Sequence, residues 1–140
     1  MNKDDCEACA DGIDAVLAKQ DKAMQDVGWY WHYVPLEEKV NIHTHGFAES
    51  FNHPDFQIVL AGLPPAVYQS ILNNFAERVK AGDVFKEDDV VENIIKSPYK
   101  VRLTTSTESQ RNVLKIILPD PQGNLSKETQ EEIYAKQWNE

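Results

Sequence analysis

Apolar residues recur along the chain at two spacings, and each spacing predicts a different element. Spacings of three and four residues predict amphipathic helices. The first helix is expected from residue 11 to about residue 27, where Gly28 follows, and a second begins at Leu63-Pro64-Pro65 and ends before Gly82. Two shorter helices are expected over residues 87–95 and 127–138.

Alternation with period two, and short apolar or aromatic runs, predict strands. The strands are expected at residues 29–34, 40–45, 56–61, 99–103 and 112–118. Residues 46–54 are expected to form a loop, and residues 104–111 either a loop or a helix. Because the first three strands follow one another directly, they predict a largely antiparallel sheet. The expected fold is a single α+β domain over residues 1–140, with a short tail at residues 1–10. Its mixed, mostly antiparallel sheet has about five strands, with helices packed on one face.

The chain is acidic, with 23 Asp and Glu residues against 14 Lys and Arg residues and a formal charge of −9. Like-charge repulsion makes nucleic acid and anionic membranes poor partners, so a basic protein is the natural complement. The first residues lack the apolar stretch of a signal peptide, and no run reaches the roughly 18–20 apolar residues of a membrane span. We therefore expect a cytosolic protein, whose oligomeric state the sequence leaves open.

These features favour a non-catalytic binding protein of the immunity or antitoxin type, which neutralises a basic toxin or effector domain by direct contact. The expected binding surface combines acidic side chains with an aromatic anchor. Its residues are Trp29, Trp31, Glu37, Glu38, Glu87, Asp88, Asp89 and Glu92. The aromatic run at residues 29–33 could equally supply the core, and a regulatory or scaffold domain fits the same features.

His43 and His45 suggest the alternative function, a metal-dependent hydrolase. Residues two apart on a strand share a face, so both imidazoles could bind one ion such as zinc. A catalytic zinc has three protein ligands and an open position, which requires His53, Asp55 or His32 to converge with the pair. Asp55 would then be a ligand or the general base. Ordinary polar histidines of a strand or loop explain the same residues without a metal.

The two cysteines, Cys6 and Cys9, have the spacing of half a structural zinc site, but no second Cys-x-x-Cys follows. One or two histidines would have to complete such a site. A redox role and incidental reduced thiols are the other interpretations. The chain has neither Gly-x-Ser-x-Gly nor a glycine-rich phosphate loop, so the sequence does not support a serine nucleophile or nucleotide hydrolysis.

Two further segments stand out in the middle of the chain, Gly46-Phe47-Ala48-Glu49-Ser50-Phe51-Asn52-His53-Pro54-Asp55-Phe56 and Ala61-Gly62-Leu63-Pro64. With supporting matches at Gly28-Trp29, His32, Gly82, Pro119-Asp120 and Gly123, they resemble the bacterial domain of unknown function 4262 family (DUF4262). The family carries Tyr-Thr-x-Gly-Leu-x-Glu and His-Pro-Glu steps, then an apolar strand and a Gly-Leu-Pro helix start. This chain has His43-Thr44-His45-Gly46 at the first step and Asp55 in place of the second glutamate. The resemblance implies an α+β fold and no established activity.

Overall fold

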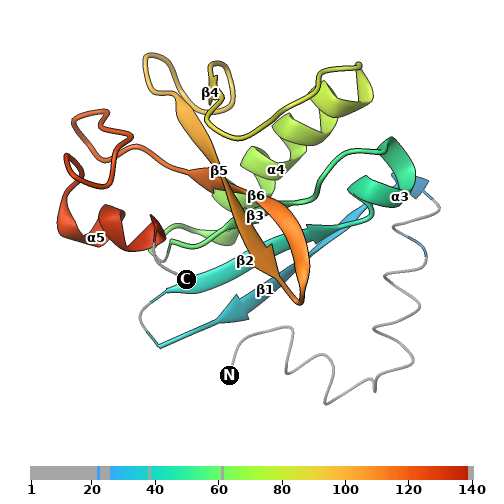
Figure 1. Cartoon of the computed structure of the whole chain (residues 1–140), viewed down its shortest axis with the longest axis horizontal. Coiled ribbons are helices and arrows are strands. Elements are labelled where there is room, and N and C mark those ends of the chain that lie inside the picture. Colours follow the sequence, from blue (N-terminus) through green and yellow to red (C-terminus); the bar gives the residue numbers. More distant parts are fainter. Residues whose placement is uncertain (1–21, 23–25, 38, 61, 139–140) are drawn as a thin grey trace.

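The chain forms a six-stranded sheet with helices around it, in a computed structural model that describes residues 22, 26–37, 39–60 and 62–138 (Figure 1). The strands lie in the order β1-β2-β3-β6-β5-β4. Their bounds are β1 Tyr30–Pro35, β2 Val40–His45, β3 Phe56–Ile58, β4 Val90–Val91, β5 Val101–Glu108 and β6 Arg111–Ile117. All neighbouring strands are antiparallel except β3 and β6, which are parallel. The sheet is therefore mixed and mostly antiparallel, as predicted, with six strands where about five were expected.

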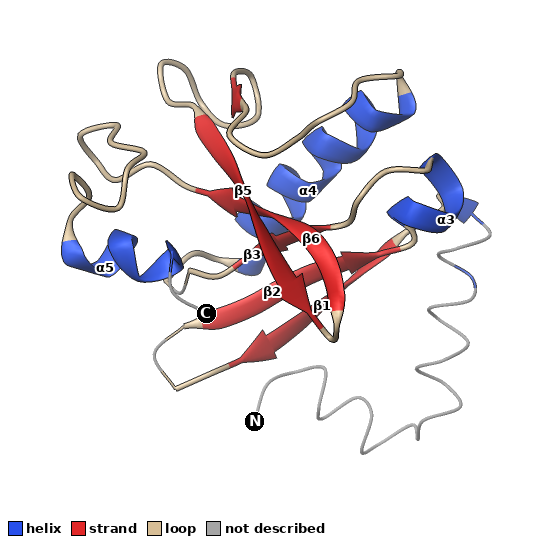
Figure 2. Cartoon of the chain, in the orientation of Figure 1, coloured by secondary structure: helices blue, strands red, loops and turns tan. Residues whose placement is uncertain are grey.

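The longest helix is α4, Pro65–Lys80, which forms where the proline-led apolar stripe predicts it. Pro65 lies in the first turn, where no helical partner exists for a backbone N–H. The other helical segments are α3 Phe47–Phe51, α5 Glu132–Ala135 and the 3-10 turn η1 Lys136–Trp138 (Figure 2). Of the helices that the described residues form, none combines the length and the apolar character needed to cross a bilayer.

The core lies between α4 and one face of the sheet. The helix contributes Tyr68, Ile71, Leu72, Phe75, Ala76 and Val79, each at most 6% exposed. Strand residues at alternating positions meet them, namely Ile42, Phe56, Ile58, Val101, Leu103, Leu114 and Ile116. The prediction of helix packing on one face is confirmed, since this apolar stripe of α4 belongs to the same core cluster as the strand residues.

The opposite face of the sheet is polar, yet much of it is buried. The strand register places His43 beside Gln57, and Gln57 beside Lys115, on this face. All three side chains are at most 4% exposed. In Figure 1 the β5–β6 hairpin crosses over β2, and contacts of Glu108 and Arg111 with β2 residues show that the hairpin lies against it. The twisted sheet thus shields its own polar face.

Two expectations for the connecting segments are wrong. Residues 46–54 were expected to be loop, but they contain the short helix α3. Gly46 (φ 108) and Asn52 (φ 52) take left-handed conformations at the two ends of this helix. Residues 87–95 form β4 and bends instead of a helix. Asp88 (φ 71) and Asn93 (φ 65) also adopt left-handed conformations, which a right-handed helix cannot contain.

The segment at residues 104–111 is neither loop nor helix. It extends β5 as far as Glu108 and turns back at Ser109 and Gln110, whose φ values are 50 and 68. Two successive left-handed residues are the geometry of a type I′ hairpin turn, here made without the usual Asn-Gly. This turn places Glu108 and Arg111 opposite each other at the hairpin end.

Some element bounds differ from the prediction. Strand β3 ends at Ile58, before the predicted limit of residue 61, and the last helical segments cover only part of residues 127–138. The helix expected over residues 11–27 falls almost wholly outside the described residues. Within that range, the described residues Lys22 and Asp26 are helical.

We expect Phe75→Ala to destabilise the fold strongly. The Phe75 ring is 0% exposed and lies between the rings of Phe56 (centroids 4.7 Å apart) and Phe85 (5.1 Å apart). Truncation leaves a cavity that costs about 3–5 kcal/mol of unfolding free energy, measured by urea denaturation. Ser70→Ala, on the exposed side of α4, is the control and should change stability by less than about 0.5 kcal/mol. A cost below about 1 kcal/mol for Phe75→Ala would contradict the described core.

Candidate metal centre

Three histidines from two adjacent strands gather on the polar face. The antiparallel register pairs His32 of β1 with His43 of β2, and the two-residue repeat of the strand puts His45 on the same face. One ligand nitrogen from each ring can be chosen so that all three lie within 4.8 Å of one another. The ring centroids are 4.6 Å apart for His32 and His45, 5.1 Å for His43 and His45, and 5.3 Å for His32 and His43. The Tyr30 ring stacks on the His45 ring, with the centroids 5.2 Å apart.

The surroundings keep two of these imidazoles neutral. Burial lowers the pKa of His43 to about 4, against the opposing attraction of Glu108. Burial also lowers the pKa of His45 to about 4, and the nearby positive charge of Arg111 adds to the effect. Neutral imidazole is the form that binds metal ions, so these side chains need not lose a proton to act as ligands near pH 7. Among the described residues, His45 Nε2 is a buried atom without a hydrogen-bond partner.

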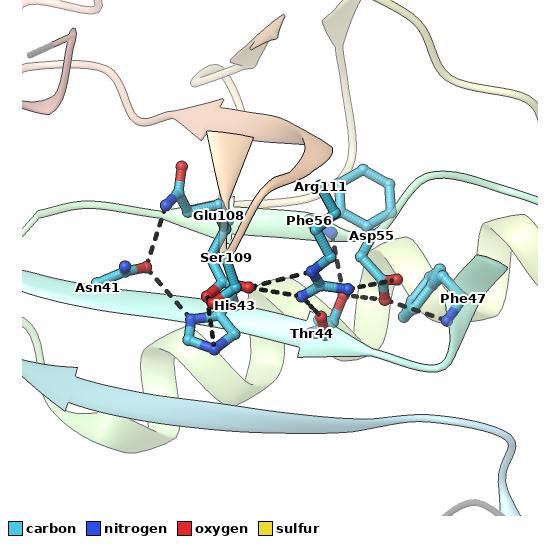
Figure 3. Close-up of polar contacts among 10 residues, drawn as sticks. Asn41, His43, Thr44, Phe47, Asp55, Phe56, Glu108, Ser109 and Arg111 are labelled. Carbon is cyan, nitrogen blue, oxygen red and sulfur yellow. Dashed lines mark hydrogen bonds and ion pairs between the residues drawn. The ribbon is translucent and has the colours of Figure 1, made fainter. Parts of the chain in front are cut away.

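Glu108 brings a carboxylate to the edge of the histidine cluster. Its Oε2 lies 3.6 Å from His43 Nε2, at the end of β5 (Figure 3). Burial raises the pKa of Glu108, but hydrogen bonds from Ser109 Oγ and Arg111 and the positive charge of Arg111 oppose burial, and the pKa falls below its usual value. Glu108 is therefore ionised near neutral pH, beside neutral imidazoles.

Arg111 connects this carboxylate to the end of β2. Its guanidinium donates hydrogen bonds from Nε to Glu108 Oε1 (3.1 Å), from Nη2 to the Thr44 carbonyl, and from Nη1 to Asp55 Oδ2 (2.9 Å). Nη2 also forms an ion pair with Glu108 Oε1 (3.0 Å). The other Asp55 oxygen accepts hydrogen bonds from Thr44 Oγ1 (2.8 Å) and the Phe47 backbone N–H (3.1 Å). Burial raises the pKa of Asp55, which is 4% exposed. Figure 3 shows this chain of contacts running from His43 through Glu108 and Arg111 to Asp55.

The structure separates the residues that the metal hypothesis grouped together. His43 and His45 lie in the cluster, and His32 is the third member. His53 lies elsewhere: its Nε2 accepts the Phe85 N–H (2.9 Å) and its Nδ1 faces the Pro54 carbonyl (2.9 Å). Asp55 is held by Arg111, Thr44 and Phe47 and is not grouped with the three histidines.

Glu108 and Arg111 are the site residues that sequence reasoning missed. They lie more than 60 residues after the histidines in a segment expected to be loop or helix, so no strand pattern placed them on a face. The sequence carries little signal for them, because apolar alternation stops at Leu103. The buried positions after it, Ser106 and Glu108, are polar.

The acidic surface predicted for a basic partner is divided between two edges of the sheet. Glu37 is exposed near β1, whereas Glu87, Asp88, Asp89 and Glu92 surround β4 at the opposite edge. All four acidic residues around β4 have intramolecular partners. Glu87 accepts from Thr105 Oγ1 (3.1 Å) and Asp89 from the Lys86 N–H (3.0 Å). Asp88 pairs with Arg102 (3.2 Å) and Glu92 with Lys100 (3.2 Å). Trp29 is 6% exposed within the core, and Trp31 packs partly buried against it. Glu38, Cys6 and Cys9 lie outside the described residues.

An apolar hollow of about 250 Å³ lies apart from the histidines. Its lining includes Leu60, Val67, Ile95, Tyr99 and Leu118, and it shares no residue with the histidine cluster or with the Glu108–Arg111 contacts. Asp120 is the one lining residue with a carboxylate, and its oxygens accept hydrogen bonds from the backbone N–H groups of Asn124 and Glu131. Within the part of the chain that the structure describes, the group of potential metal ligands thus lies on the polar face of the sheet, away from this hollow.

A family model described as "Domain of unknown function (DUF4262)" matches residues 23–130, which include all the strands and the three histidines. No curated protein and no solved structure matches the chain.

We expect Arg111→Met to destabilise the fold by about 2 kcal/mol in urea denaturation. The substitution leaves the Asp55 and Glu108 carboxylates without their shared cation, and losing one partner of a fully buried pair costs about 3–5 kcal/mol. The expected loss of about 2 kcal/mol is smaller than this range because the Arg111 side chain is 28% exposed and water screens its charge. Asp55→Asn completes a double-mutant cycle, in which the double variant should lose at least about 1 kcal/mol less than the sum of the single losses. Strictly additive losses would contradict the described Arg111–Asp55 contact.

Proposed function

The chain belongs to the DUF4262 family, and we propose that it is a metal-dependent enzyme of the hydrolase type whose ion is held by His32, His43 and His45. The observation that carries the proposal is the convergence of three imidazoles within 4.8 Å. Catalytic zinc sites combine three protein ligands with one open position for water or substrate. Three histidines on one face of the sheet supply that number of protein ligands. Zn–N bonds of about 2.0–2.1 Å in tetrahedral geometry require nitrogens roughly 3.4 Å apart, so small rotations of the imidazoles from their separations of up to 4.8 Å would complete the site.

Two further properties support a metal site over a group of structural histidines. Burial keeps the pKa values of His43 and His45 at about 4, so their lone pairs are available near neutral pH. His45 Nε2 is buried without a hydrogen-bond partner among the described residues, an arrangement that normally destabilises a fold and that an ion would relieve.

Glu108 is suited to the role of general base. Its carboxylate is ionised, lies 3.6 Å from a proposed ligand atom, and is oriented by Ser109 and Arg111. A divalent ion would supply activation of water and polarisation of a carbonyl or phosphoryl oxygen. His32, His43 and His45 would hold the ion, and Glu108 would accept a proton from the attacking water.

The acidic immunity or antitoxin function is the competing hypothesis. It draws support from the −9 formal charge and from the four acidic residues around β4, which a basic partner could contact by displacing weak surface ion pairs. We rank it second because those carboxylates already have intramolecular partners and because Trp29, one of the two tryptophans expected as the anchor, is buried, while Trp31 is partly buried. Recovery of one basic protein by the wild-type chain, lost when Glu87, Asp88 and Glu92 are changed to Gln or Asn, would reverse this ranking.

We expect the protein purified without a histidine tag or chelator to bind close to one zinc or manganese ion per chain. Elemental analysis gives the stoichiometry, and isothermal titration gives the affinity. His32→Ala and His43→Ala should each weaken binding by more than about 100-fold, since even residues that only orient a ligand contribute about 10–100-fold. The bound ion should also raise the melting temperature of the wild type.

His53→Gln is the matched control for this experiment. It changes a buried histidine that lies outside the cluster, and the amide oxygen can still accept the Phe85 N–H. Its metal affinity should equal that of the wild type. Equal losses in His53→Gln and His43→Ala would contradict the assigned ligand set, and absence of binding in the wild type would overturn the proposal.

We expect Glu108→Gln to lower hydrolysis by the metal-loaded protein by about 10²–10⁴-fold while retaining the ion. The amide keeps the size of the side chain but cannot accept a proton. Initial rates on chromogenic carboxylic and phosphoric esters provide the measurement, with elemental analysis of the same samples. Loss of the ion together with activity would make Glu108 a fourth ligand, and an unchanged rate would remove it from the mechanism.

A further inference from the structure

His43 lies between two acceptors that compete for its single ring proton. Its Nδ1 is 3.3 Å from Asn41 Oδ1, and its Nε2 is 3.6 Å from Glu108 Oε2 (Figure 3). A neutral imidazole carries one N–H, so only one of these nitrogens can donate. If the proton were on Nε2, the nitrogen that faces Glu108 would have no lone pair for a metal ion.

The Asn41 side chain is itself fixed by Gln57. Gln57 Nε2 donates to the same Asn41 Oδ1 at 3.1 Å, so the amide oxygen of Asn41 is oriented toward both side chains. Gln57 is 4% exposed, and its own Oε1 has no partner among the described residues. The local structure therefore leaves one buried acceptor unsatisfied while it orients Asn41 toward the His43 ring.

We propose that Asn41, oriented by Gln57, is a positioning residue that holds the His43 proton on Nδ1 and so leaves Nε2 as the ligand atom. The use of Nε2 as a ligand atom rests on the proposed function, whereas the His43 tautomer is a property of the metal-free protein. Metal-bound histidines commonly donate their other ring N–H to an oxygen acceptor, which fixes both the tautomer and the ring orientation. Asn41 supplies that acceptor from the same strand, two residues before His43.

The test is long-range ¹H–¹⁵N NMR of the metal-free, ¹⁵N-histidine-labelled full chain at pH 7.5, followed by zinc titration of each variant. In the wild type, His43 should be the Nδ1–H tautomer. Asn41→Leu removes the acceptor, so the proton should move to Nε2, toward Glu108, and zinc affinity should fall by about 10–100-fold. Asn41→Asp keeps an acceptor oxygen at the same position and should retain the Nδ1–H tautomer.

His53 is an internal reference in every spectrum. Its Nε2 accepts the Phe85 N–H and its Nδ1 faces a carbonyl, so it should remain the Nδ1–H tautomer in all variants and report that the fold is intact. Gln57→Met should shift His43 in the same direction as Asn41→Leu, to a smaller extent. An Nε2–H tautomer at His43 in the wild type, or an unchanged Nδ1–H tautomer in Asn41→Leu, would overturn the inference. If the tautomers behave as expected but no variant binds zinc, the positioning role stands and the proposed function fails.

Discussion

The site depends on the register between β1 and β2. That register sets His32 directly opposite His43, and the pleat of β2 then gives His45 the same face and Thr44 the other. A slip of one residue would turn His43 and His45 into the core and expose Ile42. The core therefore enforces the register, because Ile42 is 0% exposed against α4 and its neighbours. The apolar face of β2 is what aligns the imidazoles on its polar face.

Thr44 joins the two faces at the point where β2 ends. Its side chain points away from the histidines on either side of it and bonds to Asp55, while its carbonyl accepts from Arg111. Arg111 in turn holds Glu108, so the hairpin that carries the carboxylate is fastened to the strand that carries the histidines. Asp55, which the sequence suggested as a ligand or base, instead has this structural task. The result is an ionised carboxylate that Ser109 and Arg111 hold beside the neutral imidazoles of His43 and His45.

The sequence predicted the parts of this structure that local pattern determines. Alternation in β2 and the proline-led stripe of α4 are strong periodic signals, and both elements form where they were expected. His43 and His45 were identified because a two-residue spacing on a strand is enough to place them together. His32 could only be named as one of several partners, since its position depends on the pairing of β1 with β2. Glu108 and Arg111 were missed because a turn of Ser109 and Gln110 lacks the Asn-Gly signal, and because their position depends on the twist of the whole sheet.

X-ray absorption spectroscopy of the zinc-loaded protein tests the proposed centre most directly, because it reports the identity and distance of the ligand atoms. We expect three imidazole nitrogens at about 2.0–2.1 Å from zinc, with oxygen completing the shell and no sulfur. Loss of one imidazole from the shell in His32→Ala would assign the β1 ligand. Sulfur at about 2.3 Å would instead place zinc at Cys6 and Cys9, and a shell unchanged by His32→Ala would place it away from the β1–β2 pair; either result would contradict the proposed centre.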